Sequence, residues 1–562
     1  MRDLWCRRDR SRRNAAAGVA VLSVIGLVSA ISRPMRGRLE GLMQVVPFLV
    51  PRTAAVTLVF VSFALLLTAR GLRRGHHVAW LAALVLLGIS VVLHVVKGID
   101  VEEASLAIAG AAWLAAHRRS FPVGVSRASA VRALVLGTGG AVVTLIVAIA
   151  LSATLGRGER AAAAEPARFP HAGRWFDPSA IFPMHFGGHV GTAVLVALGL
   201  CLVGSTLSVL FSARVLEPLT GAAHRAVRER ARALVLRHGG GSLDYFALRD
   251  NKQWFFAGDS VVAYAVRAGV CLVSPDPIGP VDERARTWAA FMTYAEASGW
   301  SVTVLGAAPD WLPVYERSGL RAVYLGDEAV VDCAGFTLAG GAMKGLRQAY
   351  HRVQRAGYTV TFHDPAALDP RLRRQLTELS MRSRCGEAER GFSMTLSRLF
   401  DQHDTGLLLS VARDDAGHPQ AFVQWVPARN LDGWSLDVMH RNTDQDLPNG
   451  IMDFLVIETI ARVAAGTGGG LDLNFAVMRA VVSGEQTGWL ARLGRTTPGG
   501  ASRRAQIESL WRFNAKYRPR WVPRYVVLGS IDTVARQGLV MVGAEGIAEI
   551  PVLSRILGRN TP

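Results

Sequence analysis

The chain has 562 residues, a length at which two or more domains are expected. Half of the residues are hydrophobic and only 19% are charged, which excludes a disordered protein and is too apolar for a wholly water-soluble one. The formal net charge of +19 favours anionic partners such as nucleic acid or acidic lipid headgroups. We therefore expect a membrane protein with a basic surface.

Six apolar segments lie in the first 215 residues, and each is a candidate membrane helix because roughly 20 apolar residues span a bilayer. They are residues 15–31, 53–69, 78–96, 104–116, 133–155 and 190–213. A cleaved signal peptide is the alternative for the first segment, since Val28-Ser29-Ala30 resembles a cleavage site. The further spans that follow favour an uncleaved helix.

The arginines predict the orientation of these spans. With the N-terminus inside, the cytoplasmic stretches carry 19 basic residues and the opposite loops carry nine. The positive-inside rule then places the N-terminus, and everything after residue 215, in the cytoplasm. The sequence predicts a multi-pass protein of the cell membrane with a cytoplasmic C-terminal half.

Beyond residue 216 short strands, amphipathic helices and Gly-rich turns indicate a mixed α/β structure. Residues 260–266 and 270–274 predict a hairpin, 288–298 a helix, and 301–305 and 321–324 two further strands. The second part predicts a helix, a strand and a helix, then three consecutive strands, a helix, a strand and a last helix. These later elements are residues 344–356, 358–362, 370–383, 406–413, 421–427, 434–439, 450–465, 471–476 and 506–515.

Three antiparallel strands, a helix, a strand and a helix follow in the order of an acyltransferase fold of the GNAT kind. The first part resembles a degenerate copy of the second. A CoA-dependent member carries a Gly-rich pyrophosphate loop before the helix at 450–465, and residues 441–450 contain no such loop. We expect an acyl donor other than CoA, and the basic charge favours a polyanionic donor.

Two stretches concentrate that charge. Residues 344–384 have a net charge of +6, with Lys344, Arg347, His351, Arg352 and Arg355 at helical spacing. Residues 495–524 have a net charge of +7 and interleave Trp, Phe and Tyr with arginine. Aromatic residues between arginines suit the unpaired end of a tRNA. For the first stretch, contact with anionic lipid is an equal alternative.

The segment from Gln506 to Tyr525, which reads QIESLWRFNAKYRPRWVPRY, strongly resembles the closing signature of the lysylphosphatidylglycerol synthases, also called aminoacyl-phosphatidylglycerol synthases or multiple peptide resistance factors. Further matches follow the family's order, at residues 256–259, 274–279, 345–357, 391–394 and 449–453. The resemblance covers about residues 240–535. Residues 473–479 resemble the variant found in members fused to a lysyl-tRNA synthetase, and we expect no synthetase in this chain.

The resemblance implies transfer of an aminoacyl group, commonly lysyl, from charged tRNA to the glycerol hydroxyl of phosphatidylglycerol. The cationic product lipid lowers susceptibility to cationic antimicrobial peptides. We expect no cofactor and no metal. A membrane lipid transporter or scaffold with non-catalytic lobes is the rival from another class, and a transferase acting on another lipid or cell-wall acceptor is the third interpretation.

The candidate catalytic residues are Asp437, His440, Arg441 and Lys516. The resemblance favours Asp437, near the end of a central strand, for orienting the acceptor hydroxyl or the substrate ammonium. Where the family commonly has Asp-Leu-Met-Arg, this chain has Asp437-Val438-Met439-His440 and then Arg441. His440 is either a proton acceptor near neutral pH or a surface histidine. Lys516 is one of four lysines among 59 arginines, which suggests a specific need for its compact ammonium.

The remaining predictions concern substrate contacts and domain limits. The predicted substrate-binding residues are Arg347, Arg352, Arg355, Glu508, Arg512, Asn514, Arg518 and Arg524, of which the last two are expected to contact phosphate, while Trp521 is expected in the core. We expect a transmembrane domain over residues 1–215, GNAT-like lobes over 216–343 and 344–535, and a tail over 536–562.

Overall fold

The computed structural model describes residues 2–31, 49–98, 100–125, 127–162, 188–214, 219–384, 391–444, 446–477, 511–529 and 531–545. The chain divides into two compact units, which are described separately. The helical unit comprises Met1–Val215 with Tyr294–Trp300, and the sheet unit comprises Leu216–Thr293 with Ser301–Pro562.

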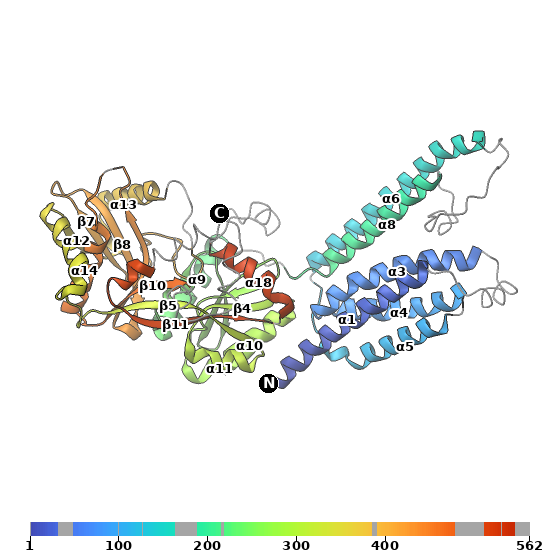
Figure 1. Ribbon diagram of the computed structural model, residues 1–562, viewed down its shortest axis with the longest axis horizontal. Helices are drawn as coiled ribbons and strands as arrows, with labels where there is room; N and C mark the ends of the chain where they lie inside the picture. The colour runs from blue at the N-terminus through green and yellow to red at the C-terminus, as the bar shows by residue number, and fades with distance from the viewer. Residues whose placement is uncertain are drawn as a thin grey trace. The chain divides into compact units, whose positions relative to one another are not determined.

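The helical unit has one helix over each of the six predicted apolar segments (Figure 1). They are α1 (Arg2–Ile31), α3 (Leu49–Arg73), α4 (His77–Gly98), α5 (Val101–Ala116), α6 (Arg127–Ala162) and α8 (Gly188–Leu210). Within the described residues, three stretches are long and apolar enough to cross a membrane, namely Arg7–Ala30, His77–Val96 and Arg127–Ala150, and Leu195–Leu210 is a shorter apolar helix. The unit is built as a membrane domain.

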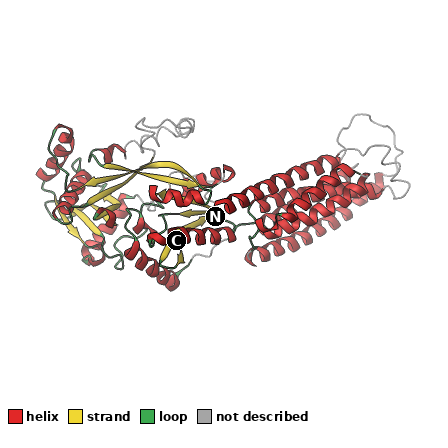
Figure 2. Cartoon of the chain, turned by 90° about the horizontal axis from the view of Figure 1, so that it is seen from below, coloured by secondary structure: helices red, strands yellow, loops and turns green. Residues whose placement is uncertain are grey.

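The sheet unit is organised around one mixed sheet of eleven strands in the order β1-β2-β3-β4-β11-β5-β10-β9-β8-β7-β6 (Figures 1 and 2). The strands are β1 (Gln253–Ala257), β2 (Ser260–Arg267), β3 (Val270–Val273), β4 (Ser301–Ala307), β5 (Arg321–Asp332), β6 (Thr359–His363), β7 (Leu408–Arg413), β8 (Pro419–Ala428), β9 (Gly433–Arg441), β10 (Gly470–Val477) and β11 (Arg520–Leu528). The two predicted lobes therefore share one continuous sheet.

The last strand of each lobe crosses into the other. β5, from the first lobe, pairs with β10 of the second, and β11, from the second lobe, inserts between β4 and β5. The central β5–β11 pair runs antiparallel from Arg520 opposite Val330 to Leu528 opposite Arg321. This exchange gives the sheet an approximate two-fold arrangement, with β3 and β4 in the first lobe corresponding to β9 and β10 in the second.

The described helices of this unit are α9 (Gly221–His238), α10 (Arg284–Ala297), α11 (Leu312–Arg317), α12 (Lys344–Arg355), α13 (Pro370–Ser383), α14 (Ile451–Ala465) and α18 (Ile531–Ala544). Local signals fix several boundaries. The Asp369 carboxylate accepts hydrogen bonds from the first backbone N–H groups of α13, and Pro370 occupies the first helical position, where no N–H is needed. Gly417 takes a positive φ of 80° in the tight β7–β8 turn.

The core of the second lobe lies mainly on two sides of its strands. On one side, apolar residues of α14 pack with Ala421, Val423 and Trp425 of β8. On the other, α13 packs with Phe422 and with Val438 of β9. Trp521 packs against the α14 side, as expected for a core residue. β1, β11 and α18 were not expected, and most of α18 lies in the segment predicted as a tail, residues 536–562.

Candidate active site

β9 and β10 part in the middle of the sheet. Their parallel pairing is limited to Leu471 with Trp434 and Asp472 with Ser435, although both strands continue beyond these residues. At the same level β10 bulges against β5 between Asp472 and Phe475, where Asn474 takes a left-handed φ of 70°. Bulges redirect side chains and occur often beside active sites.

Asp437 occupies a second bulge at this level. β8 pairs Gln424 with Val438 and Trp425 with Leu436, so Asp437 is the extra residue of β9. The Asp437 side chain is buried, with 3% of the residue exposed. Its Oδ1 accepts a hydrogen bond from the Leu396 N–H at 2.7 Å, and its Oδ2 accepts one from Gln424 Nε2 at 2.7 Å. Two donors from different segments therefore fix the orientation of the carboxylate.

Gln424 contributes an unsatisfied acceptor at the same point. The residue is fully buried, and within the described part of the chain its Oε1 accepts no hydrogen bond. The neighbouring Asn474 Nδ2 donates to the carbonyls of Leu436 and Met394, at 3.1 and 3.3 Å, and so bridges the parted strands. A buried carbonyl without a donor costs about 1–3 kcal/mol, which makes Gln424 Oε1 a natural acceptor for a substrate N–H or O–H.

Two more buried carboxylates, Asp472 and Glu328, extend from Asp437 toward the first lobe, and we call these three carboxylates the acidic row. Asp472 accepts a hydrogen bond from Ser435 Oγ at 2.7 Å, and burial together with the nearby Glu328 charge raises its pKa well above the usual range. Glu328 forms an ion pair with Arg524 at 2.9 Å and accepts a hydrogen bond from Ser242 Oγ at 2.8 Å. The Arg524 guanidinium is thus the positive charge that stabilises Glu328 and the nearby Asp472.

In the first lobe, the position between β3 and β4 corresponds to the position between β9 and β10, and side chains of the first lobe fill it. Asp276, which follows β3, accepts hydrogen bonds from the Tyr315 hydroxyl and from the Ala308 N–H directly after β4. Burial raises the pKa of Asp276 to about 7. Burial also raises the pKa of Asp244, although the N–H groups of Gly240 and Gly241 bind it. A cation near this row would relieve the cost of its buried acids.

His440 lies on the α13 side of β9, where its ring packs on Phe422 at 5.2 Å between centroids. It is buried, and burial followed by the Arg384 charge lowers its pKa to about 4. The ring is therefore neutral and only weakly basic at pH 7. The burial shows that the interpretation as a surface histidine is wrong, whereas the role as a proton acceptor stays a prediction. Arg441 is exposed at the end of β9.

A cavity of about 230 Å³ lies beside Leu396, the residue whose N–H donates to Asp437. It is lined by Thr377 and Ser380 of α13, Arg384, and the loop residues Leu396, Ser397 and Leu399. Leu396 connects this cavity to Asp437 through the hydrogen bond from its N–H. The lining combines hydroxyl groups and one guanidinium with the apolar side chains of Leu396 and Leu399.

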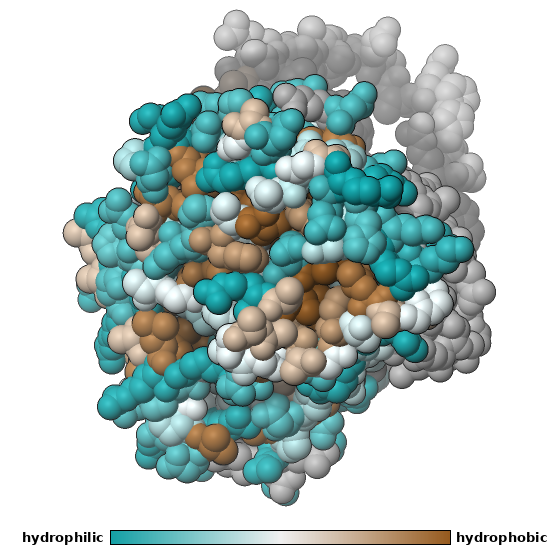
Figure 3. Space-filling model, turned by 90° about the vertical axis from the view of Figure 1, so that its left-hand side faces the viewer, coloured by the Kyte–Doolittle hydropathy of each residue, from teal (hydrophilic) through white to brown (hydrophobic). Residues whose placement is uncertain are grey.

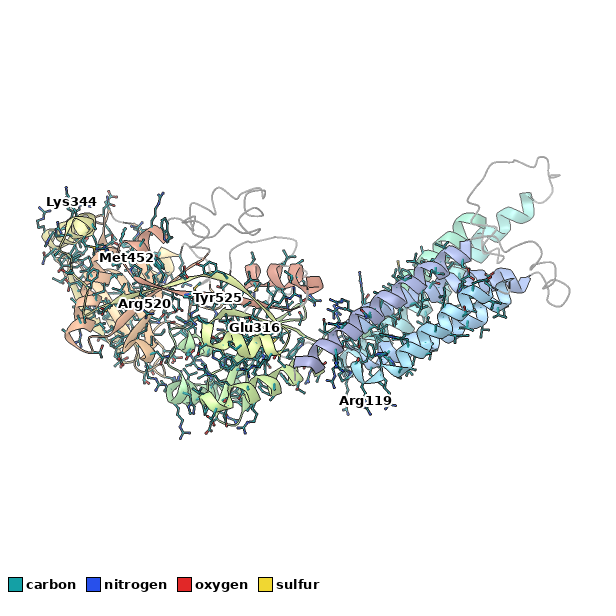
Figure 4. All side chains as sticks on the ribbon, turned by 60° about the horizontal axis from the view of Figure 1, so that its bottom comes forward. Arg119, Glu316, Lys344, Met452, Arg520 and Tyr525 are labelled. Carbon is teal, nitrogen blue, oxygen red and sulfur yellow. The ribbon has the colours of Figure 1, made fainter. Side chains whose placement is uncertain are left out.

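Lys516 and Arg352, one from each basic stretch, both contact the N-terminal end of α14. Lys516 Nζ binds the Asp453 carboxylate in the first turn of α14 at 3.1 Å, and the Tyr517 hydroxyl donates to the same carboxylate at 2.7 Å. Arg352 of α12 donates to the Asn449 carbonyl at 3.1 Å, directly before α14. Figure 4 shows Lys344, Met452 and Arg520 in this part of the sheet unit, and Figure 3 shows hydrophilic side chains interspersed with hydrophobic patches on the face in view.

The exposed cations at this end include several predicted substrate contacts. Arg352, Arg355, Arg512 and Arg518 are exposed, and Arg347 is half-buried with its guanidinium on the Leu338 and Gly340 carbonyls. The structure thus brings together basic residues separated by about 160 positions in the sequence. It does not join them to Asp437, because Lys516 lies with α14 and Asp437 lies beside α13.

Arg524 differs from its prediction. It is buried, and its guanidinium binds Glu328 and Ser242 instead of facing solvent. A phosphate contact with tRNA needs an accessible guanidinium, so Arg524 is a structural residue of the sheet. Asn514 is also buried and makes no side-chain hydrogen bond among the described residues. Glu508 lies outside the described residues.

Sequence reasoning missed Gln424, Asp472, Asn474 and Glu328. Each is a polar residue inside an otherwise apolar strand, and that interruption of the pattern was the available signal. For a metal, the described residues offer one group of close ligand atoms, from His94, Asp100 and Glu103 in the helical unit. The site around Asp437 offers hydrogen-bonding and charged groups.

Comparison with known proteins assigns the family. The family model described as phosphatidylglycerol lysyltransferase, C-terminal, matches residues 232–528. The lysylphosphatidylglycerol biosynthesis bifunctional protein LysX of Mycobacterium marinum is 38% identical over 362 residues, covering 63% of this chain and 32% of LysX. LysX of Mycobacterium leprae is 31% identical over 570 residues, covering 96% of this chain and 49% of LysX.

This chain therefore spans less than half the length of these two relatives. The solved structure of L-PGS from Bacillus licheniformis shares the fold of the sheet unit, with a TM-score of 0.51 and 23% identity, over 57% of this chain and 97% of that one. The family match contains β1 to β11, and with them Asp437, Gln424 and Lys516. The chain belongs to the phosphatidylglycerol lysyltransferase family, the lysylphosphatidylglycerol synthases.

Proposed function

We propose that this chain transfers an aminoacyl group, most simply lysyl, from charged tRNA to the glycerol hydroxyl of phosphatidylglycerol. The observation that carries the proposal is the buried Asp437 in its strand bulge, with the unsatisfied Gln424 Oε1 beside it, inside the domain that matches the family. The cationic product lipid would lower the affinity of the membrane for cationic peptides.

The reaction needs positioning more than activation. The glycerol oxygen attacks the carbonyl carbon of the aminoacyl ester, a new ester C–O bond forms, and the bond to the ribose oxygen breaks. The proton of the glycerol hydroxyl passes to the ribose oxygen that leaves. One ester replaces another, so orientation, charge stabilisation and a path for one proton suffice.

The acidic row suits a cationic aminoacyl group. Asp437, Asp472 and Glu328 lie along it, and Arg524 supplies one positive charge. An ammonium group held here would lower the pKa of Asp472, which burial raises, and binding would be favourable for that reason. In this arrangement Asp437 and Gln424 Oε1 accept hydrogen bonds from the ammonium or from the acceptor hydroxyl.

The basic end of α14 suits the tRNA. Exposed arginines on α12 and in residues 512–520 provide phosphate contacts, and Phe513 and Lys516 add an aromatic ring with an ammonium 5.0 Å from its centre. His440, neutral at pH 7, shapes the α13 side of the site. Lys516, held by Asp453, is the proposed contact for a phosphate or a developing oxyanion.

The helical unit would deliver the lipid. We propose a multi-pass arrangement with the N-terminus and the sheet unit in the cytoplasm, which the excess of basic residues on that side supports. Charged tRNA is cytoplasmic, so this orientation places donor and catalytic domain in one compartment.

Lipid analysis tests the proposal. The chain is expressed in a host that makes phosphatidylglycerol but no aminoacylated form, and the membrane lipids are compared by mass spectrometry with those from an Asp437→Asn variant. We expect an aminoacyl-phosphatidylglycerol to accumulate in the first sample and only a trace of it in the second. In membranes supplied with radiolabelled lysyl-tRNA, ribonuclease should abolish transfer and acetyl-CoA should not replace the tRNA. Equal lipid profiles with both folded proteins present would reject the transferase.

A further inference from the structure

The loop of residues 391–399 supports Asp437 from outside the sheet. Its Leu396 N–H is the backbone donor to Asp437 Oδ1. The loop begins with Gly391 at a positive φ of 104°, and the Thr395 hydroxyl closes the turn by donating to the Gly391 carbonyl at 2.9 Å. Residues 391–395 thus form one hydrogen-bonded turn that ends directly before Leu396.

Glu545 holds the start of this turn. Its Oε2 accepts the Phe392 N–H at 3.1 Å and its Oε1 accepts the Ser393 N–H at 3.0 Å. Each carboxylate oxygen therefore serves one of two consecutive backbone donors, and both residues are fully buried. Charge-assisted bonds of this kind are stronger than bonds between neutral groups.

Glu545 is itself anchored by α18. Val540 of α18 packs in one apolar cluster with Phe392 and with Val270 and Leu272 of β3. The buried Gln537 donates to the Val302 carbonyl of β4 at 3.0 Å and accepts the Gly529 N–H at 3.1 Å. α18 is thus fixed on the first lobe, although it follows the last residue of the family match, 528.

The first lobe holds the rest of the loop. Arg249 Nη1 donates to the Thr395 carbonyl at 2.9 Å, and the Asp250 N–H donates to Ser397 Oγ at 3.0 Å. The buried Lys252 ammonium lies 4.6 Å from the centre of the Phe392 ring. The first lobe and α18 together set the position of the Leu396 N–H.

We propose that Glu545 is a positioning residue for the transfer reaction, which acts on Asp437 through the turn of residues 391–396. This inference rests on the proposed function. It assigns a role in the active site to a helix outside the family match, and it gives the first lobe a purpose as the support of the catalytic loop.

The test uses the full chain in membranes and the Glu545→Gln variant, which keeps the size of the side chain and replaces one acceptor oxygen by a donor. Glu316→Gln is the matched control, since Glu316 is an exposed carboxylate on α11 (Figure 4). We expect kcat to fall about 10- to 100-fold in Glu545→Gln, because small displacements of a catalytic group cost that much. KM for charged tRNA and the activity of Glu316→Gln should stay at the wild-type values.

Two further measurements identify the route of the effect. Amide hydrogen exchange at Leu396 should become faster in Glu545→Gln and remain unchanged in Glu316→Gln. In an Asp437→Asn background, Glu545→Gln should lower the residual rate by less than twofold, because the group it positions is already altered. If Glu545→Gln lowers the yield of folded protein, Glu545→Asp, which keeps the charge on a shorter side chain, should give an intermediate kcat per folded molecule.

The outcomes separate this inference from the proposed function. Inactive wild-type protein would reject the transferase, whereas an active wild type with unchanged kcat and Leu396 exchange in Glu545→Gln would reject the positioning role. A rise in KM for tRNA with kcat unchanged would also reject it. Equal losses of rate in the wild-type and Asp437→Asn backgrounds would show that Glu545 acts independently of Asp437.

Discussion

Replacing Gln424 by methionine separates a catalytic role from a structural one. The change keeps an unbranched side chain of similar length and removes both polar atoms. In the structure, Nε2 donates to Asp437 at 2.7 Å, whereas Oε1 is buried and accepts no hydrogen bond within the described residues. The substitution therefore removes one favourable interaction and one unfavourable burial.

The two contributions have similar size. A hydrogen bond to a charged group contributes about 1.5–3 kcal/mol to stability, and a buried acceptor without a donor costs about 1–3 kcal/mol. These terms oppose each other, so the free energy of unfolding should change by no more than about 2 kcal/mol in either direction. If Oε1 binds the substrate, the loss of that bond and of the hold on Asp437 should lower kcat/KM by about 10- to 100-fold, since each tenfold change corresponds to about 1.4 kcal/mol.

The assay is transfer of radiolabelled lysine from tRNA to lipid, run beside urea unfolding followed by tryptophan fluorescence. Gln424→Glu is the contrasting variant, because it places a second acid against Asp437 and removes the donor to it, so it should lose both stability and activity. Wild-type kcat/KM in a folded Gln424→Met variant would refute the reasoning. A large loss of stability in that variant with kcat/KM unchanged per folded molecule would make Gln424 structural.

Three further predictions concern charges around the site. His440→Gln should leave the shape of the pH–rate profile between pH 6 and 8 unchanged, because the His440 pKa is already about 4. Burial of neutral His440 contributes stability that is present above about pH 6.5 and is lost as the pH falls toward 4, so urea midpoints of the wild type should drop over that interval and those of His440→Gln should drop less. Asp404→Asn should destabilise the sheet unit by about 3–5 kcal/mol in urea unfolding. The reason is that Asp404 pairs with two buried arginines of α9, at 2.7 and 3.2 Å. A loss of stability below about 1 kcal/mol would contradict this prediction. Arg352→Ala should weaken tRNA binding and reduce its log–log salt slope by roughly 0.7 to 0.9, whereas Arg524→Ala should lower thermal stability instead, and the reverse pattern would contradict the assignment.

The sequence predicted the elements whose patterns are local. The three consecutive strands over β7, β8 and β9 and the helices α12, α13 and α14 lie within two residues of their expected limits. Asp437 was identified because it lies near the end of a predicted central strand, in a segment that resembles a family motif. These predictions depend on periodicity, turn residues and caps, all of which act over a few positions.

Arg524 shows what local patterns cannot supply. It lies in a stretch with net charge +7, which predicts an exposed phosphate contact, yet its partner Glu328 is 196 positions away and belongs to the other lobe. The two residues meet only because β11 crosses to β5. The same exchange explains why β11 was missed, since its partners were assigned to a separate lobe.

The exchanged strands also explain why the protein would keep its first lobe, although side chains fill the site of that lobe. Asp276 and Tyr315 fill the position of the first lobe that corresponds to the candidate active site of the second. The lobe nevertheless supplies β5 to the catalytic sheet, Glu328 to the acidic row, and Arg249 to the loop that supports Asp437. The proposed transfer of an aminoacyl group from a tRNA ester to a lipid hydroxyl needs a rigid frame more than it needs reactive groups. In this protein the first lobe provides that frame, and so its substitutions should affect turnover through position and not through chemistry.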